Sequence, residues 1–129
     1  MKIFSCEQIR KIDDYTIRYE PISSIDLMER AAGQIFNWYV SRFERSHRIF
    51  IFAGPGNNGG DGLALARMLS ANRYDVEVHY VQFSEKTSPD WEINRLRLQA
   101  ETDVRLNYLD SPDQFPVIGP EDIIIDAIF

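Results

Sequence analysis

The stretch "AGPGNNGGDG", Ala53–Gly62, holds five glycines, two asparagines and one aspartate in ten residues. It follows the apolar run "RIFIF", residues 48–52, and precedes the helix-like run "LALARMLS", residues 63–70. A glycine-rich turn between a buried strand and a helix is typical of nucleotide-binding α/β proteins, because glycines let the backbone turn sharply and approach a ligand. This stretch therefore indicates both the fold class and the place of a candidate site.

On either side of it, the hydrophobic pattern predicts alternating helices and strands. We expect helices from Ser5 and from Ser23 or Ser24 to about Arg45, a strand over 48–53, a helix over 61–72, a strand over 75–83, a helix opened by Ser88 and Pro89, a short strand over 103–109 and a final strand over 123–129. This alternation predicts an α/β fold with a mostly parallel sheet and two leading helices. Right-handed crossovers are expected to place helices on both faces of the sheet.

The composition is that of one globular domain over residues 1–129, with a net charge of −6 and a pI of about 4.8. No broad basic field is present to hold a nucleic-acid backbone, so we expect no nucleic-acid partner. The one basic cluster, Arg42, Arg45, His47 and Arg48, falls where a helix is expected to end, where cations favour the helix dipole.

Cys6 is the single cysteine, which rules out an intrachain disulfide and fits a reducing cytoplasm. The start of the chain does not resemble a signal peptide, and no apolar run is long enough to span a bilayer, so we expect no membrane partner. The sequence ends on "EDIIIDAIF", which resembles a buried parallel strand, and such strands normally lead into a loop and a helix. We therefore expect an incomplete domain with further residues after Phe129; the alternative is a natural terminal strand.

The glycines Gly54, Gly56 and Gly59 match the dinucleotide pattern G-x-G-x-x-G at the required junction of strand and helix. The carboxylate that usually binds a ribose at the end of the second strand, about 20 residues later, is missing, because the strand end "VHYVQF", residues 78–83, holds none and the next is Glu85. Two asparagines are also unusual in a loop that only holds phosphate. Asp61 is expected at the helix start, where it either acts on a ligand or is a plain N-cap.

Other site types find no support in the sequence. There is no G-K-[ST] motif of a P-loop and no serine in a nucleophile elbow. Cys6, His47 and His79 are scattered over different elements and do not predict a zinc site. His79 lies within a predicted strand and is interpreted as a packed or surface imidazole.

Asp126 stands near the end of the apolar strand "IIIDAIF". A carboxylate in such a strand is costly unless it is paired, hydrogen-bonded or metal-bound, and ligands of parallel sheets gather beyond the carboxyl ends of strands. If the final strand neighbours the first, Asp126 and the glycine loop face one crevice, where amide and carboxylate oxygens would suit a hard cation. The alternative is a strand end without chemistry.

Three stretches together are similar to one known family. These are "GNNGGDGLALARML" after the strand, "LMERAAG" before it and "DAIF" near the end. The chain resembles the NAD(P)H-hydrate epimerase family, the YjeF N-terminal domain, over nearly its whole length. The resemblance implies a Rossmann-like three-layer αβα fold and interconversion of the R and S epimers of hydrated NADH or NADPH. It also implies a potassium ion, a homodimer and, in some bacterial members, a fused ADP- or ATP-dependent hydrate dehydratase domain.

The resemblance also assigns residues. Asn57, Asn58, Gly59, Gly60 and Asp61 would contact the hydrated cofactor, and Asn58 and Asp126 would bind potassium. In the family, the strand that carries Asp126 leads into a further loop, G-x-G-L-x-R, which is absent here.

The chemistry needs a group that assists loss and readdition of the ring hydroxyl. Asp61 is the candidate acid or base in this chain. Two other functions stay open: a non-catalytic scaffold module of the same fold, and an NAD(P)-dependent oxidoreductase, which the missing strand-end acid disfavours.

Overall fold

The computed structural model describes residues 22–129, and its elements follow the alternating order expected from the sequence. In chain order they are α2 (Ser24–Val40), β1 (Arg48–Ala53), α3 (Asn57–Ala71), β2 (Asp75–Tyr80), α4 (Pro89–Glu101), β3 (Leu106–Tyr108), the 3₁₀ turn η1 (Pro112–Gln114) and β4 (Ile123–Ala127). The second of the two expected leading helices is α2. The first, predicted from Ser5, lies outside the described residues, as does Cys6.

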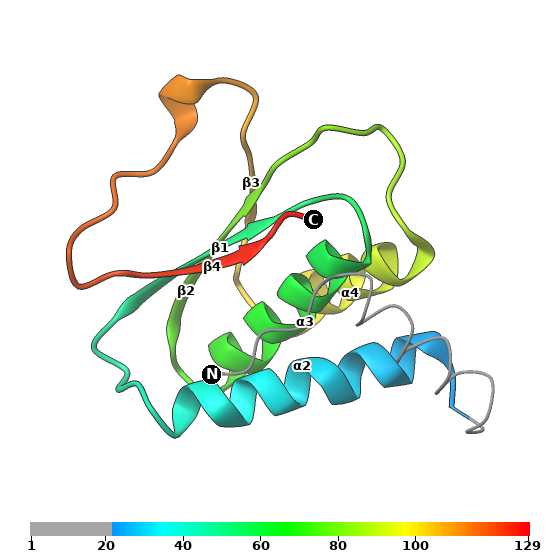
Figure 1. Ribbon diagram of the computed structural model, residues 1–129, viewed down its shortest axis with the longest axis horizontal. Helices are drawn as coiled ribbons and strands as arrows, with labels where there is room; N and C mark the ends of the chain where they lie inside the picture. The colour runs from blue at the N-terminus through cyan, green and yellow to red at the C-terminus, as the bar shows by residue number, and fades with distance from the viewer. Residues whose placement is uncertain (1–21) are drawn as a thin grey trace.

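The four strands form one parallel sheet in the order β3-β2-β1-β4. β1 is paired on both sides, so that Ile51 stands opposite Val78 of β2 and Ile125 of β4. The chain runs outward from β1 to β3 and then returns to the other side of β1, which makes a topological switch point between β1 and β4 (Figure 1). The predicted Rossmann-like α/β class and the adjacency of the first and last strands are confirmed.

One face of the sheet is covered by helix α3, which packs on β1, β2 and β4 (Figure 1). We call this the helix-covered face. Its residues are apolar and come from alternate positions of the strands: Ile49, Ile51, Ala53, Val76, Val78, Tyr80, Ile123, Ile125 and Ala127. Full burial of an aliphatic side chain is worth about 1.5–3 kcal/mol relative to exposure, so this face contributes the main core of the domain.

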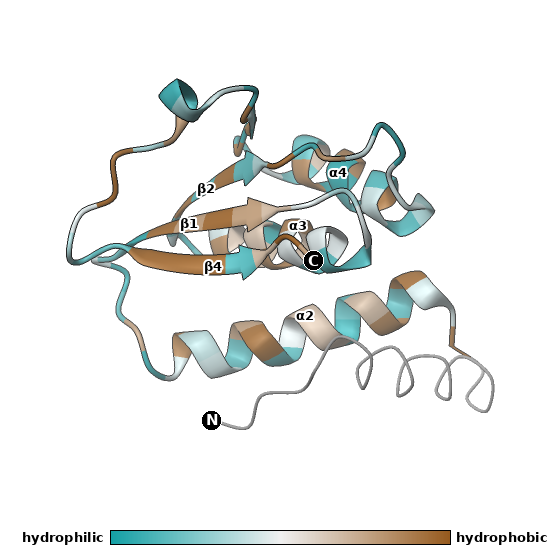
Figure 2. Cartoon of the chain, turned by 45° about the horizontal axis from the view of Figure 1, so that its top comes forward, coloured by the Kyte–Doolittle hydropathy of each residue, from teal (hydrophilic) through white to brown (hydrophobic). Residues whose placement is uncertain are grey.

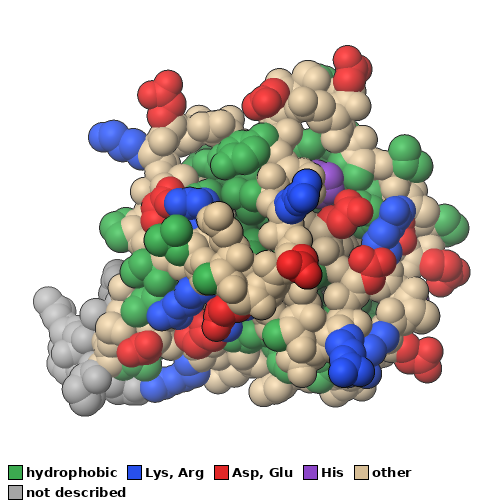
Figure 3. Space-filling view, turned by 180° about the vertical axis from the view of Figure 1, so that it is seen from behind, with side chains coloured by type: hydrophobic (Ala, Val, Ile, Leu, Met, Phe, Trp, Pro, Cys, Tyr) green, Lys and Arg blue, Asp and Glu red, His purple; other side chains and the backbone are tan. Residues whose placement is uncertain are grey.

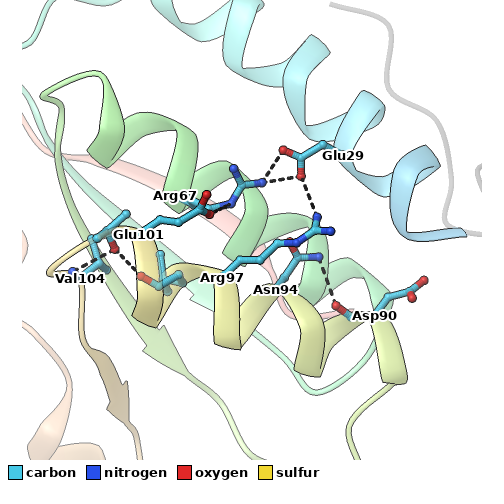
Figure 4. Close-up of polar contacts among 9 residues, drawn as sticks. Glu29, Arg67, Asp90, Asn94, Arg97, Glu101 and Val104 are labelled. Carbon is cyan, nitrogen blue, oxygen red and sulfur yellow. Dashed lines mark hydrogen bonds and ion pairs between the residues drawn. The ribbon is translucent and has the colours of Figure 1, made fainter.

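An ion network joins the three helices above that face (Figure 4). Arg67 of α3 donates to both carboxylate oxygens of Glu29 on α2, and its Nε lies 3.4 Å from Glu101 of α4 without hydrogen-bond geometry. Arg97 of α4 lies 3.6 Å from the same Glu29. The Arg67 side chain is only 14% exposed, so these contacts fix how α2 and α4 lie against α3.

The opposite face of the sheet, which we call the second face, differs from the expectation of helices on both sides. All described helices lie on the helix-covered face, because β3 returns to β4 through an irregular connection that holds only η1 (Figures 1 and 2). Within residues 22–129, the second face is covered only by this connection. Phe115 from it stacks on Phe52 at 5.1 Å between ring centroids, while Ile124 stays 53% exposed.

Three element ends differ from the predicted ones. α2 ends at Val40 rather than near Arg45, β2 ends at Tyr80 rather than Phe83, and β4 ends at Ala127 rather than Phe129. The two phenylalanines extend the apolar pattern of their strands, but they lie beyond the sheet and stack on each other, with centroids 5.2 Å apart. Phe83 and Phe129 are therefore exposed residues that contact each other and do not extend β2 and β4.

The basic cluster is structural, as predicted, but it lies beyond the end of α2. Each of its arginines stands over an aromatic ring: Arg42 over Trp38, Arg45 over Tyr74 and Arg48 over Phe50. The Nε of Arg45 also donates to the carbonyl of Asn72, the C-cap of α3, at 3.0 Å. The cations therefore stabilise rings and the end of a neighbouring helix rather than the dipole of their own helix.

Candidate functional site

The candidate site lies at the carboxyl end of β1, where the chain turns into α3 beside the switch point. The helix begins at Asn57, with Gly56 as its N-cap, and so starts before the predicted residue Asp61. Asparagine and glycine have low helix propensity, which is why the sequence alone favours a loop there. Tertiary packing overrides this preference because the turn needs residues without side chains.

Close backbone contacts explain the glycines of this turn. A Cβ at Gly54 would lie 2.0 Å from the carbonyl oxygen of Ile128, and one at Gly59 would lie 1.8 Å from the carbonyl oxygen of Gly54. At Gly60, it would meet the Met28 side chain at 3.0 Å. Gly59 and Gly60, both predicted to contact substrate, are buried and bring α3 against the loop and against α2.

The first turn of α3 has the electrostatic character expected of an anion or dipole site. Gly56 provides no side-chain cap, and the intrahelical ladder starts with the Gly60 N–H donating to the Gly56 carbonyl at 3.0 Å. The N–H groups of the preceding helical residues therefore lack intrahelical partners and carry the positive end of the helix dipole.

Asn57, Asn58 and Asp61 lie on one side of this helix end. Asp61 is one helical turn after the asparagines, at spacings of four and three residues, which places the three side chains on neighbouring positions. Asn57 is exposed, while Asn58 and Asp61 are half-buried. Asp61 is not an N-cap, because that position belongs to Gly56. The alternative of Asp61 as a plain cap is thus ruled out.

Asp126 lies on β4 opposite Phe52 of β1 and belongs to the second face. One of its carboxylate oxygens, Oδ1, accepts a hydrogen bond from the Ile128 N–H at 3.1 Å. The Nδ2 of Asn58 donates to the carbonyl of Phe129, three residues further along the same strand end. Asn58 thus contacts the segment that follows β4, but within residues 22–129 no hydrogen bond joins the Asn58 and Asp126 side chains.

A pocket of the second face opens beside Asp126. Its walls are mainly apolar and come from β1, from β4, from the residues just after β2 and β4, and from the connection after β3: Phe52, Val81, Leu109, Asp110, Ser111, Pro112, Phe115, Ile124, Asp126 and Ile128. Seen from behind, hydrophobic side chains gather in a hollow near the top of the molecule, with charged side chains on the segments around it (Figure 3). Asp126 is therefore an acidic side chain in the mainly apolar lining of this pocket.

Two contacts of this site were not predicted from the sequence. The indole Nε1 of Trp91 donates to the Gly54 carbonyl at 2.9 Å, and the Ser88 N–H donates to the Pro55 carbonyl at 3.1 Å. Ser88 and Pro89 were recognised as a helix start, and Ser88 does cap α4 through the Trp91 N–H at 3.1 Å. The tryptophan in the first turn of α4 was the one sequence feature that could have indicated a contact with the glycine turn.

Within residues 22–129, no group of three or more histidine, cysteine, aspartate or glutamate side chains could hold a metal ion. His79 is packed between rings of the second face, with its centroid 5.6 Å from that of Phe52, and its Nε2 lies 3.2 Å from Glu77. Its predicted role as a packed imidazole is confirmed. No helix in the described part of the chain is long and apolar enough to cross a membrane.

A parallel sheet with a glycine-rich turn at its switch point defines a Rossmann-like α/β domain. The family of the YjeF-related protein N-terminus matches residues 24–129, so the chain belongs to this family, which is that of the NAD(P)H-hydrate epimerases. The resemblance noted from the sequence is thereby confirmed.

Individual relatives agree with this placement. The chain is 33% identical over 126 residues to the NAD(P)H-hydrate epimerase of Oenococcus oeni, covering 97% of this chain and 57% of that protein. It is 43% identical over 74 residues to the bifunctional NAD(P)H-hydrate repair enzyme Nnr of Dictyoglomus turgidum, covering 56% of this chain and 14% of that protein.

Among solved structures, the crystal structure of yeast ynu0 (YNL200c) is similar with a TM-score of 0.72 at 28% identity. That similarity covers 100% of this chain and 57% of the yeast chain. The chain thus spans little more than half the length of the Oenococcus oeni and yeast proteins.

Proposed function

We propose that the protein interconverts the R and S epimers of hydrated NADH and NADPH, and that this chain contributes part of the substrate site. The observation that carries the proposal is the start of α3, where N–H groups without intrahelical partners lie next to Asn57, Asn58 and Asp61 within the family match. The epimerase names of the relatives support the same activity.

In this proposal, residues 57–61 contact the hydrated cofactor. The asparagine amides both donate and accept hydrogen bonds, which suits the hydroxyl and amide groups of a hydrated nicotinamide nucleotide. Gly59 and Gly60 contribute through their backbone and through the close packing that holds the helix end in place. Asp61, one turn into the helix, is the proposed general acid or base that assists loss and readdition of the ring hydroxyl.

We further propose that Asn58 and Asp126 hold a potassium ion. The Nδ2 of Asn58 is used by the Phe129 carbonyl, which leaves the amide Oδ1 as a ligand, and Asp126 supplies a carboxylate at the same edge. An all-oxygen donor set fits a hard cation. When bound, the ion would supply positive charge beside the substrate.

The rival functions have less support. An oxidoreductase that binds the ribose in the usual way needs an acid at the end of the second strand, but β2 ends on Tyr80 and Val81 and Gln82 follow. A scaffold module has no need of the Asn-Asn-Gly-Gly-Asp sequence that this chain keeps. A homodimer and a cytoplasmic setting remain part of the proposal, as does a fused hydrate dehydratase domain, which is supported by the name of the bifunctional NAD(P)H-hydrate repair enzyme of Dictyoglomus turgidum.

Thermal unfolding of the protein with NADPH hydrate, unmodified NADPH and KCl tests the proposal. We expect the midpoint temperature of unfolding to rise with the concentration of NADPH hydrate. At a concentration of 100 times Kd, bound ligand adds about 2.7 kcal/mol to the free energy of unfolding. NaCl at equal ionic strength is the control for KCl. A rise with unmodified NADPH alone would favour the oxidoreductase, and no rise with either would contradict the epimerase.

The role of Asp61 is tested by Asp61→Asn in the same protein. We expect slower exchange between the two epimers, followed by chromatography, with binding of NADPH hydrate retained. An unchanged exchange rate would show that Asp61 is not the acid or base.

A further inference from the structure

Four consecutive carbonyls at the turn from β1 into α3 accept hydrogen bonds from the protein. The donor and acceptor pairs are Val81 N–H to Ala53, Trp91 Nε1–H to Gly54, Ser88 N–H to Pro55 and Gly60 N–H to Gly56. Two of these donors come from the start of α4, which is far from the turn in sequence. The carbonyl oxygens of the turn are therefore held by the protein and kept away from a ligand.

The two donors of α4 form a closed set of contacts with the turn. Trp91 donates to the Gly54 carbonyl at 2.9 Å, and Ser88 donates to the next carbonyl, that of Pro55, at 3.1 Å. Ser88 in turn accepts from the Trp91 N–H at 3.1 Å through its hydroxyl. The Trp91 side chain is 2% exposed and packs on the Tyr80 ring at 5.1 Å between centroids, so the indole has little freedom to move.

These contacts set the direction of the N–H groups that start α3. The peptide unit is planar and the described chain has no cis peptide bond, so the Gly56 N–H points opposite to the Pro55 carbonyl. The Gly54 carbonyl lies between the Trp91 indole and the Cα of Gly59, where even a Cβ would not fit. The orientation of the helix start thus depends on where α4 holds the turn.

We propose that Trp91 is a positioning residue for the ligand site: with Ser88, it holds the Gly54-Pro55 segment so that the N–H groups from Gly56 onward face the bound nicotinamide nucleotide. This rests on the proposed function, because the ligand is the hydrated cofactor. Trp91 touches the loop and not the substrate, so it acts through backbone orientation. Its indole is also placed to report ligand binding, since its N–H partner belongs to the binding loop.

The test uses Trp91→Phe, which keeps a ring and removes the donor, and measures the Kd for NADPH hydrate. We expect binding at least tenfold weaker, and amide resonances of residues 56–59 shifted in the protein without ligand. Trp38→Phe is the matched control, because Trp38 is 39% exposed on α2, and we expect no change in Kd. In the Trp38→Phe background, the emission of Trp91 is expected to shift as NADPH hydrate is added.

Leu98→Ala separates positioning from loss of stability. Leu98 is 2% exposed on the same helix, and its truncation destabilises the packing of α4 without removing a contact to the turn. We expect its Kd, measured where the protein is folded, to remain that of the unaltered protein. The role of Trp91 would be overturned if Trp91→Phe and Trp38→Phe had equal Kd values for NADPH hydrate. It would also be overturned if Trp91→Phe and Leu98→Ala weakened binding of NADPH hydrate by the same factor. Failure of the unaltered protein to bind NADPH hydrate would instead overturn the proposed function as well.

Discussion

The two faces of the sheet are built from the same strands and differ in what covers them. On the helix-covered face, Ile49, Ile51 and Val78 are fully buried under α3. On the second face, apolar residues such as Phe52 lie beside ionisable ones such as His79 and Asp126, and the cover in the described chain is an irregular connection. We infer that the helix-covered face contributes most of the stability of the domain, and that the second face leaves polar groups such as Asp126 accessible to a ligand.

The largest expected difference is between two isoleucines of neighbouring strands. Ile51 is fully buried on the helix-covered face, whereas Ile124 is 53% exposed on the second face. We expect Ile51→Ala to lower the free energy of unfolding by about 2–5 kcal/mol, because it leaves a cavity under α3. Ile124→Ala is expected to cost about 0.5 kcal/mol. Urea unfolding of both variants measures this, and equal losses would contradict the difference between the faces.

Replacing either of two glycines by alanine is expected to change the stability of the domain in opposite directions. A Cβ at Gly62 would lie 2.9 Å from the Cβ of Ala127 and 3.2 Å from Ile51, so α3 would have to move off the sheet. We expect Gly62→Ala to destabilise by about 1–3 kcal/mol. Among residues 22–129, no atom lies within 4 Å of a Cβ added at Gly33 in the middle of α2, and Gly33→Ala is expected to stabilise by about 0.5–1 kcal/mol. Thermal melts of both would show whether α3 lies as close to the sheet as described.

Within the helical layer, two glutamates compare a half-buried network with a surface pair. Glu29→Gln removes the charge that pairs with Arg67, whose side chain is 14% exposed, and we expect a loss of about 1.5–3 kcal/mol. Glu92 pairs with Arg95 at 2.9 Å near the surface, and Glu92→Gln is expected to cost about 0–1 kcal/mol. If denaturant midpoints of the two variants coincide, the network does not hold the helices.

The smallest effect is expected at the start of β4, where Arg48 donates to Asp122 at 2.9 Å. This hydrogen bond and that from the Gly119 N–H hold the pKa of Asp122 below its ordinary value. The contribution of a carboxyl with a lowered pKa is present above the unfolded pKa of about 3.9 and is lost as the pH falls through the folded pKa.

We therefore expect unaltered protein to be more stable than Asp122→Asn at pH 6, with the difference disappearing as the pH is lowered below about 4. Urea midpoints of the two proteins across this range measure it. A difference that stays constant down to the lowest pH would show that the carboxylate charge has no part in anchoring β4.

Much of the fold could be predicted because local signals agreed with tertiary structure. The apolar run before Ala53 and the run "IIIDA" form adjacent parallel strands, and Ser88 caps a helix as its sequence indicates. The start of α3 could not be predicted, because Asn57 and the glycines after it favour a loop by propensity and become helical through close packing. The second face, which no helix of residues 22–129 covers, was also not predicted, since periodicity says which residues alternate and not what packs on each side.

For the candidate site, the sequence predicted that the glycine turn follows a strand next to the one that carries Asp126, but not the contacts that hold the turn. Asp126 and the glycine loop were expected to face one crevice if the first and last strands were neighbours; the strands are neighbours, and Asn58 of the loop donates to the Phe129 carbonyl after β4. Trp91 was missed because its contact with Gly54 joins segments far apart in the chain, and a buried tryptophan at a helix start has many other uses. Such long-range contacts require the fold.

The most direct test of the proposed site is a titration of the ¹⁵N-labelled chain with NADPH hydrate, followed by amide resonances. The account predicts the largest shifts at residues 56–61 and around Asp126, with small shifts for residues of the helix-covered face such as Val78. Adding KCl at constant ionic strength should enhance the shifts near Asn58. Shifts confined to other parts of the surface, or none at saturating concentrations, would contradict a nucleotide site at the carboxyl end of β1.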